Sequence, residues 1–383
     1  MKNEMNSQIK LLESKRIIIK LGSSIITNDG NGIDEGCLLS LVKQIEKLAN
    51  KDKEIVLVSS GAIAAGLKKL GIAKRPRELS ELQAAAAVGQ MSLLKIYEQL
   101  FSKCNLISAQ VLLTHEDLSN RKRYLNARST LNNLIIKKVI PIINENDTVA
   151  SDEIKFGDND TLGAMVANLL EADLLILLTD QDGLFSDDPR RNDNAHLVEH
   201  AYIDDEKLDL LANDTISSVG TGGMITKIQA ARKAASSGTH SIIASGRREN
   251  ILTEIGSNNF YGTFLECREP KQLARKKWLA DILRSTGKVF IDSGAINALV
   301  EEGKSLLAVG VTKVNGNFDR GEVVKCLDAE GGEVAQGLIN YSSDELNMIK
   351  GLSTDKIESI LGYVNEQSLI HRNNLVITRS KGK

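Results

Sequence analysis

Cysteine, proline and aromatic residues are scarce in this chain of 383 residues. It contains 4 cysteines, 4 prolines and 1 tryptophan, and aromatic residues make up 4% of the sequence. The cysteines are far apart and form no C-x-x-C pair, which argues against a disulfide framework and against a zinc site. We therefore expect a protein of a reducing compartment, with no metal ion held by the chain itself.

An excess of charge of either sign is also missing. The 48 lysines and arginines against 50 aspartates and glutamates give a net charge of -2, with an isoelectric point near 6.3. Nucleic acid and anionic lipid usually attract proteins through a basic excess. Neither partner is expected here.

Long hydrophobic runs are absent as well. No run reaches the length that spans a membrane, and residues 1–15 are polar, without the apolar core of a signal peptide. We expect a cytoplasmic protein without a membrane partner. Residues 1–15 are predicted to be a disordered extension.

The chain does contain a regular alternation of short apolar runs and longer helical patterns. This alternation is typical of a parallel α/β sheet, in which ligands bind beyond the carboxyl ends of the strands. The length allows a large domain plus a smaller second one. Strands are predicted at 17–20, 55–58, 106–111, 139–143, 174–178 and 242–244, and helices between them at 37–48, 82–100, 124–137 and 162–170.

Polar and glycine-rich segments follow several of these strands and would gather at one rim of the sheet. Each alone indicates only a capped turn at a strand end. Their number favours a ligand site instead. The segments are Lys20-Leu-Gly-Ser, Ser59-Ser-Gly-Ala, Ile143-Asn-Glu-Asn-Asp, Leu178-Thr-Asp-Gln and, at the start of a helix, Gly157-Asp-Asn-Asp.

Gly220-Thr-Gly-Gly-Met-Ile-Thr-Lys227 is the most informative single motif. Its glycines let backbone N–H groups turn inward, the following helix offers its positive end, and Lys227 adds a full charge. The motif is neither a Walker A loop nor a G-x-G-x-x-G fingerprint, and alone it would be a weak signal. Lys20 is the second candidate for a phosphate contact, because a lysine seldom ends a buried strand unless an anion meets it.

Together these motifs resemble those of the glutamate 5-kinases, a family of the amino acid kinase superfamily. The resemblance covers nearly the whole chain. It implies an α/β/α sandwich with a mostly parallel sheet at residues 16–269. It also implies ATP-dependent phosphorylation of the side-chain carboxylate of L-glutamate to L-glutamyl 5-phosphate, the first step of proline biosynthesis.

Two alternatives stay open. The chain could be another amino acid kinase with a different small acid as substrate, since kinases of N-acetylglutamate, aspartate, carbamate or UMP share the fold. It could also be an RNA-binding or regulatory protein with a degenerate kinase domain. The intact Lys20, Asp160 and Lys227 disfavour the second alternative.

The sequence pattern changes after residue 269. A basic linker is predicted at 270–286, and Gly-Asn-Phe-Asp-Arg-Gly-Glu-Val at 316–323 resembles a PUA domain, a small β-rich pseudo-barrel, expected at 287–366. A terminal strand and basic tail would follow at 367–383. PUA domains are best known from RNA-modifying enzymes, but residues 287–383 hold eleven Lys or Arg against thirteen Asp or Glu. A structural or regulatory role is therefore favoured.

The resemblance also implies roles for individual residues. Lys20 and Lys227 would flank the transferring phosphoryl group, Asp160 would hold both lysines, and Mg²⁺ would bridge the phosphates of ATP. For glutamate, Asp147 would accept from the α-ammonium group and Asn159 would bond a carboxylate. The implied substrate-binding residues are Ser60, Gly61, Ala62, Asp147 and Asn159, and the implied ATP-binding residues are Lys20, Thr179, Asp180, Thr221, Gly222, Gly223, Met224, Ile225, Thr226 and Lys227.

Regulation and partners are expected from the same resemblance. Proline shares the α-carboxylate and the cationic amine of glutamate but lacks its side-chain carboxylate, so it would inhibit competitively. Glu153, in the polar segment 147–157, is the candidate residue for this feedback. The reductase that takes the labile glutamyl phosphate and further copies of the chain are the other expected partners.

Overall fold

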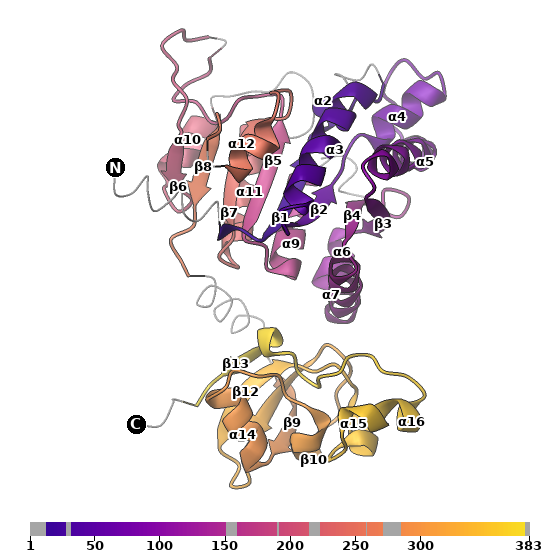
Figure 1. Ribbon diagram of the computed structural model, residues 1–383, viewed down its shortest axis with the longest axis vertical. Coiled ribbons are helices and arrows are strands. Elements are labelled where there is room, and N and C mark those ends of the chain that lie inside the picture. The colour runs from indigo at the N-terminus through magenta and orange to yellow at the C-terminus, as the bar shows by residue number, and fades with distance from the viewer. Residues whose placement is uncertain are drawn as a thin grey trace. The chain divides into compact units, whose positions relative to one another are not determined.

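The computed structural model describes residues 13–27, 32–150, 159–189, 191–213, 223–257, 259–270 and 285–379. Apart from residues 119–126, which group with the second unit, the chain divides near residue 275 into two compact units, each with a hydrophobic core of its own (Figure 1). Residues 1–12, most of the predicted linker and residues 380–383 lie outside the described residues. The predicted domain boundaries therefore stay predictions. No helix within the described ranges is long and apolar enough to cross a membrane.

The first unit is built on one mixed sheet. Its strands are β1 (Arg16–Leu21), β2 (Glu54–Val58), β3 (Ile107–Leu113), β4 (Val139–Glu145), β5 (Leu174–Thr179), β6 (His200–Tyr202), β7 (His240–Ser245) and β8 (Thr263–Glu266). They lie in the order β3-β4-β2-β1-β5-β7-β8-β6, and every neighbouring pair is parallel except β7 with β8. All six predicted strands are present, and the mostly parallel sheet is confirmed.

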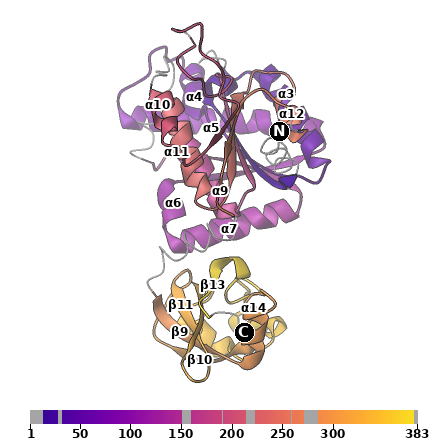
Figure 2. The same cartoon turned by 90° about the vertical axis from the view of Figure 1, so that its left-hand side faces the viewer.

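Helices cover both faces of this sheet. They are α2 (Ser23–Ile26), α3 (Glu35–Ala49), α4 (Ala62–Lys69), α5 (Leu79–Lys103), α6 (His115–Ser119), α7 (Arg121–Ile136), α9 (Asn159–Leu170), α10 (Lys207–Asn213), α11 (Met224–Ala235) and α12 (Ile251–Gly256). Figure 2 shows α9 and α11 on one side of the sheet and α3 and α12 on the other. The predicted three-layer sandwich is confirmed.

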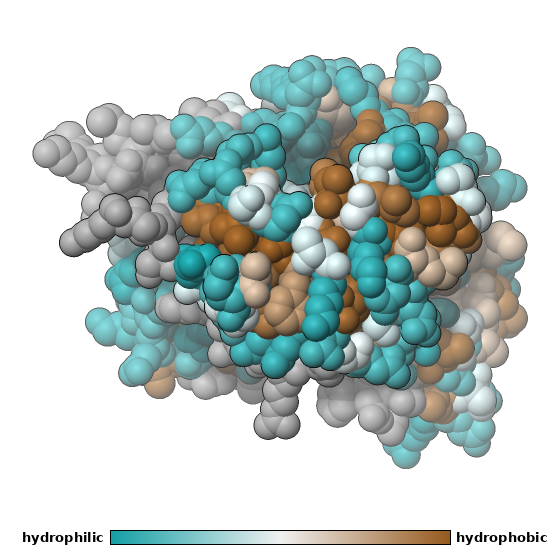
Figure 3. Space-filling view, turned by 90° about the horizontal axis from the view of Figure 1, so that it is seen from below, coloured by the Kyte–Doolittle hydropathy of each residue, from teal (hydrophilic) through white to brown (hydrophobic). Residues whose placement is uncertain are grey.

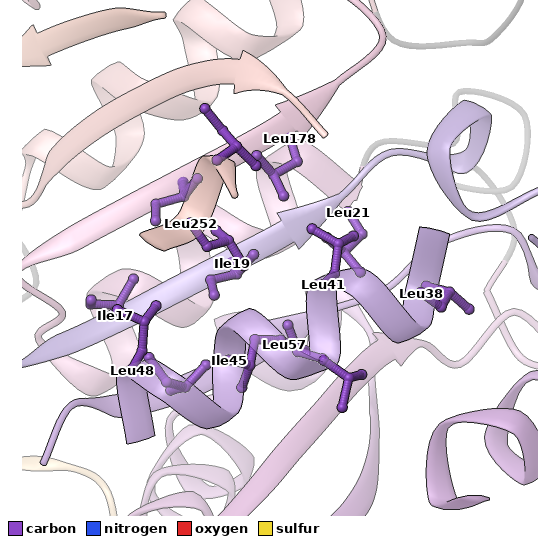
Figure 4. Close-up of a cluster of buried hydrophobic side chains, with 14 of the residues drawn as sticks. Ile17, Ile19, Leu21, Leu38, Leu41, Ile45, Leu48, Leu57, Leu178 and Leu252 are labelled. Atoms are coloured by element: carbon purple, nitrogen blue, oxygen red, sulfur yellow. The ribbon is translucent and has the colours of Figure 1, made fainter. Parts of the chain in front are cut away.

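One face of β1 forms the main core with α3. Side chains alternate between the two faces of a strand, and the alternate residues Ile17, Ile19 and Leu21 all belong to this core. Helix α3 begins where Asp34 accepts a hydrogen bond from the backbone N–H of Cys37 at 2.9 Å, and its apolar face packs onto the strand. Figure 4 shows β1 side chains such as Ile19 beside α3 side chains such as Ile45.

The opposite face of β1 is turned toward α9. The strand alternation places Ile18 and Lys20 there, and α9 packs against β1 on that side. The last polar side chain of a buried strand is thereby aimed at the first turn of α9, which begins at Asn159.

Helices α4 and α5 cross with their backbones in contact. A Cβ atom on Gly66 would lie 1.7 Å from the carbonyl oxygen of Ala85, and one on Gly89 would lie 1.8 Å from that of Ala62. No side chain larger than hydrogen fits at either position. The crossing fixes the start of α4, which follows directly on the polar segment after β2.

The second unit holds a smaller sheet with its own core. Its strands are β9 (Ser285–Ile291), β10 (Val311–Asn315), β11 (Val323–Leu327), β12 (Glu333–Leu338) and β13 (Leu375–Ile377), in the order β10-β9-β11-β12-β13. Helices α14 (Ser293–Val300), α15 (Ser343–Ile349) and α16 (Ile357–Leu361) pack with it. A capping box between Ser342 and Glu345 starts α15. Figure 3 shows hydrophobic patches among hydrophilic side chains on this unit, whose exposed apolar residues include Val309 and Met348.

Candidate active site

Two lysines and one aspartate meet at the carboxyl edge of the large sheet. Lys20 Nζ lies 2.6 Å from Asp160 Oδ1, and Lys227 Nζ lies 3.2 Å from Asp160 Oδ2. Lys20 comes from the end of β1, while Asp160 and Lys227 come from the first turns of α9 and α11. Lys20 is 6% exposed, Asp160 2% and Lys227 5%.

Asp160 is held as a carboxylate. Burial alone would raise its pKa, but the ammonium groups of Lys20 and Lys227 outweigh burial and hold the pKa well below the usual range. The hydroxyl of Thr226 lies 3.1 Å from Asp160 Oδ2 and 2.8 Å from the carbonyl oxygen of Gly223. The side chain that joins the two lysines is thus fixed by several contacts at once.

The charge balance of this cluster favours an anion. Among these three side chains, two ammonium groups face the one carboxylate of Asp160 in a nearly dry place. Buried positive charge is stabilised by nearby negative charge, so the cluster favours an anionic group. The N-termini of α9 and α11 add to the positive potential.

A second polar cluster follows β2. Gly61 has a φ of +85° at the start of α4, and a Cβ there would lie 2.9 Å from a methyl group of Thr27. Asn159 Nδ2 lies 2.6 Å from the carbonyl oxygen of Ser59 and 3.3 Å from Ser60 Oγ. Because Asn159 and Asp160 are adjacent, the first turn of α9 joins this cluster to the lysines.

Asp147 and Thr179 stand at two further strand ends. Asp147 is half-buried after β4, and burial raises its pKa to about 6 although Arg75 pulls the pKa down. Thr179, at the end of β5, donates to Asp180 Oδ1 at 2.9 Å. β5 lies directly beside β1, which brings Thr179 to the same edge as Lys20.

The structure thus brings together most of the predicted site residues. Gly223, Met224 and Ile225 lead into or begin α11. Thr221, Gly222 and Glu153 lie outside the described residues. The roles predicted for all of these residues stay predictions.

Comparison with known families agrees with the fold. The sequence profile of the Amino acid kinase family matches residues 15–245. The chain belongs to the amino acid kinase family. The profile of the PUA domain matches residues 287–361, which confirms the predicted fold of the second unit.

Relatives of this amino acid kinase extend over nearly its full length. Glutamate 5-kinase of Nitrosospira multiformis is 56% identical over 367 residues, covering 96% of this chain and 99% of that protein. Glutamate 5-kinase of Paraburkholderia phymatum is 54% identical over 367 residues, covering 96% of this chain and 99% of that protein. The resemblance to the glutamate 5-kinases is therefore confirmed. Among solved structures, an isopentenyl phosphate kinase in complex with its substrate is 19% identical, with a TM-score of 0.47 over 66% of this chain and 100% of that one.

Two residues of α5 in this amino acid kinase contact the polar segments of the site without having been assigned from the sequence. Gln90 Oε1 accepts a hydrogen bond from Asn144 Nδ2 at 2.7 Å, and Tyr97 OH lies 3.0 Å from Ser59 Oγ. Gln90 and Tyr97 are seven residues apart on α5, which is two helical turns, so they share one face. The sequence signal that could have pointed to Gln90 is its polar side chain inside an alanine-rich, apolar helical stretch.

Proposed function

We propose that this chain transfers the terminal phosphoryl group of ATP to the side-chain carboxylate of L-glutamate. The product is L-glutamyl 5-phosphate, and the reaction is the first step from glutamate to proline. The observation that carries the proposal is the pair of buried lysines held by one carboxylate, next to the polar side chains of Ser60 and Asn159. The relatives named glutamate 5-kinase support the choice of substrate.

The acceptor needs no general base. A glutamate side chain has a pKa of about 4.3 in water and is ionised at neutral pH, so it can attack as it stands. What opposes the reaction is the approach of two anions. Two unit charges about 4 Å apart repel by roughly 4 kcal/mol at an effective dielectric constant of 20.

Lys20 and Lys227 are suited to remove this repulsion. Their ammonium groups contact different oxygens of the Asp160 carboxylate, and all three side chains are buried. In a site with little water each positive charge acts strongly on the oxygens of the moving phosphoryl group. Asp160 keeps the two lysines at fixed positions, so little reorganisation is needed during transfer.

Mg²⁺ is proposed to arrive with ATP. In the described part of the chain no group of three or more His, Cys, Asp or Glu side chains is arranged to hold a metal ion. Asp160, whose carboxylate contacts both lysines, is already occupied by them. Bound to the phosphates, the ion would supply further neutralisation of charge.

The test is ATP-dependent formation of glutamyl hydroxamate in the presence of hydroxylamine. L-Glutamate is compared with aspartate, N-acetylglutamate and carbamate at equal concentration. The proposal expects efficient turnover of L-glutamate alone. Faster turnover of one of the rival acids would give the chain a different substrate within the family. If none of the four acids, glutamate included, supports ATP consumption, the proposal is rejected.

We further propose the regulation and assembly expected from the sequence. Proline would compete with glutamate, the reductase that consumes the labile acyl phosphate would act next, and the protein would work in the cytoplasm. Several copies of the chain would assemble. In support of assembly, the edge strand β3 leaves Ile107 67% exposed.

A further inference from the structure

A line of side-chain hydrogen bonds runs from α5 to the substrate side of the site. Gln90 accepts from Asn144 Nδ2 at 2.7 Å, and Asn144 Oδ1 accepts from Asn159 Nδ2 at 3.0 Å. Asn144 and Asn159 are 2% and 8% exposed, so water competes little for these bonds. Gln90 itself is half-buried on α5.

Backbone groups fix which end of each buried amide points where. The N–H of Glu145 can only donate, and it lies 2.9 Å from Asn144 Oδ1. The carbonyl oxygen of Ser59 can only accept, and it lies 2.6 Å from Asn159 Nδ2. Turning either asparagine amide by 180° would set donor against donor or acceptor against acceptor.

The amide nitrogen of Asn159 is therefore fully used inside the protein. It carries two hydrogens, and the carbonyl of Ser59 and the oxygen of Asn144 take both. None remains for a substrate carboxylate, which differs from the role expected from the sequence. Within the described residues no group donates to Asn159 Oδ1, so this oxygen is left as an acceptor.

Ser60 offers a hydrogen-bond donor where Asn159 offers an acceptor. Its hydroxyl oxygen lies 3.3 Å from Asn159 Nδ2, the longest of the three contacts of that nitrogen, and among the described residues its own hydrogen has no acceptor. A hydroxyl hydrogen suits a carboxylate, whereas the oxygen of Asn159 suits an ammonium group. Neighbouring side chains thus present a donor and an acceptor, as an amino-acid zwitterion requires.

We propose that Gln90 is a positioning residue that, through Asn144, holds Asn159 with its oxygen toward the substrate. That oxygen accepts a hydrogen bond from the α-ammonium group of the amino-acid substrate, beside the half-buried Asp147. The proposal deepens the proposed function and rests on it. The hydrogen bonds from Gln90 through Asn144 to Asn159 would then determine specificity for amino acids over dicarboxylic acids without an amino group.

The first test separates positioning from general stability. Gln90→Met removes the acceptor for Asn144 at similar size, and Gln90→Ala removes it at a half-buried helix position where alanine is favourable. Both should raise KM for glutamate roughly tenfold, the worth of one hydrogen bond, with KM for ATP and kcat within about twofold of wild type. Gln90→Glu keeps an acceptor and should restore KM for glutamate. Gln99→Met, at an exposed position of the same helix, is the matched control.

An unchanged KM for glutamate in Gln90→Met and Gln90→Ala would overturn the proposal. Equal increases in the KM values of both substrates would overturn it too, because they would indicate a merely structural role. A wild-type protein that does not phosphorylate glutamate at all would instead reject the proposed function, so the two failures are distinguishable.

The second test addresses the polarity of Asn159. Glutarate is glutamate without the ammonium group, and its inhibition constant against glutamate is measured for wild type and for Asn159→Ala. Loss of the acceptor should weaken glutamate much more than glutarate, so the preference for glutamate should fall roughly tenfold. If both acids weaken by the same factor, Asn159 does not bind the ammonium group.

Discussion

Lys20 and Lys227 each belong to a buried ion pair with Asp160, so the effect of either lysine on turnover can be measured with the other still paired. Lys20→Ala or Lys227→Ala makes the cluster electrically neutral and removes a charge that acts on the transferring group. We expect kcat to fall by about a hundredfold or more in each variant. Steady-state kinetics, with melting temperatures as a check on folding, measure this.

Lys47→Ala is the matched control for the lysine variants, because Lys47 is exposed on α3, away from the site. Its turnover should equal that of wild type. Near-normal turnover of either cluster variant would remove that lysine from the mechanism.

Asp147 gives the site a dependence on pH. Burial raises its pKa to about 6, so the side chain is a carboxylate above pH 6 and becomes a neutral acid below it. If the carboxylate binds the α-ammonium group, kcat/KM for glutamate should fall as the pH is lowered through 6, by roughly tenfold at pH 5. Initial rates between pH 5 and 8 measure the profile.

Asp147→Asn provides the comparison. It should show a low kcat/KM at every pH and no step near pH 6, because the asparagine does not titrate. A step that persists in this variant would belong to another group. Asp160 should add no step in this range, since its pKa is held well below it.

At the scale of elements, the crossing of α4 and α5 depends on two glycines. Gly66→Ala or Gly89→Ala would force apart backbones that leave less than 2 Å for a Cβ atom. We expect a loss of stability of about 1–3 kcal/mol or more, and a raised KM for glutamate, because α4 begins at Ala62 in the substrate segment. Urea unfolding and kinetics measure the two effects.

Gly36→Ala is the control for the glycine variants. Gly36 lies in the first turn of α3, where a Cβ would meet no atom closer than 3.5 Å. This substitution should leave stability unchanged or raise it by about 0.5–1 kcal/mol. Equal behaviour of Gly36→Ala and Gly66→Ala would contradict the close crossing.

The central strands were predictable because parallel strands buried on both faces are continuous apolar runs, as in residues 174–178. The short strands β6, at one edge of the sheet, and β8, beside it, were missed. Each has three or four residues, and β6 reads His-Ala-Tyr, which carries no clear period. Their pairing depends on neighbours that are distant in sequence.

The reacting cluster could be anticipated from motifs, since a lysine at a strand end and another at a helix start need an anion. The part played by α5 could not. Gln90 and Tyr97 lie more than 40 residues from Asn144 along the chain. Only the fold brings their face of the helix against the ends of β2 and β4.

At the scale of the whole molecule, the two units have separate hydrophobic cores. A chain of residues 1–277 should therefore remain folded and keep kinase activity, although its regulation by small molecules can change. Circular dichroism and the hydroxamate assay measure this. A soluble but wholly inactive truncated chain would show that the site depends on the C-terminal unit.

The central claim is that an oxygen of the glutamate side chain attacks the terminal phosphorus of ATP. It is tested most directly with L-glutamate whose side-chain carboxylate carries ¹⁸O at both oxygens. Hydroxylamine attacks the acyl carbon of the product, the bond between that carbon and the bridging oxygen breaks, and phosphate leaves with the bridging oxygen. The account predicts phosphate that contains one ¹⁸O atom per turnover, in step with ADP formation. Phosphate without ¹⁸O, formed at the rate of ADP, would mean that water attacks instead and would contradict the account.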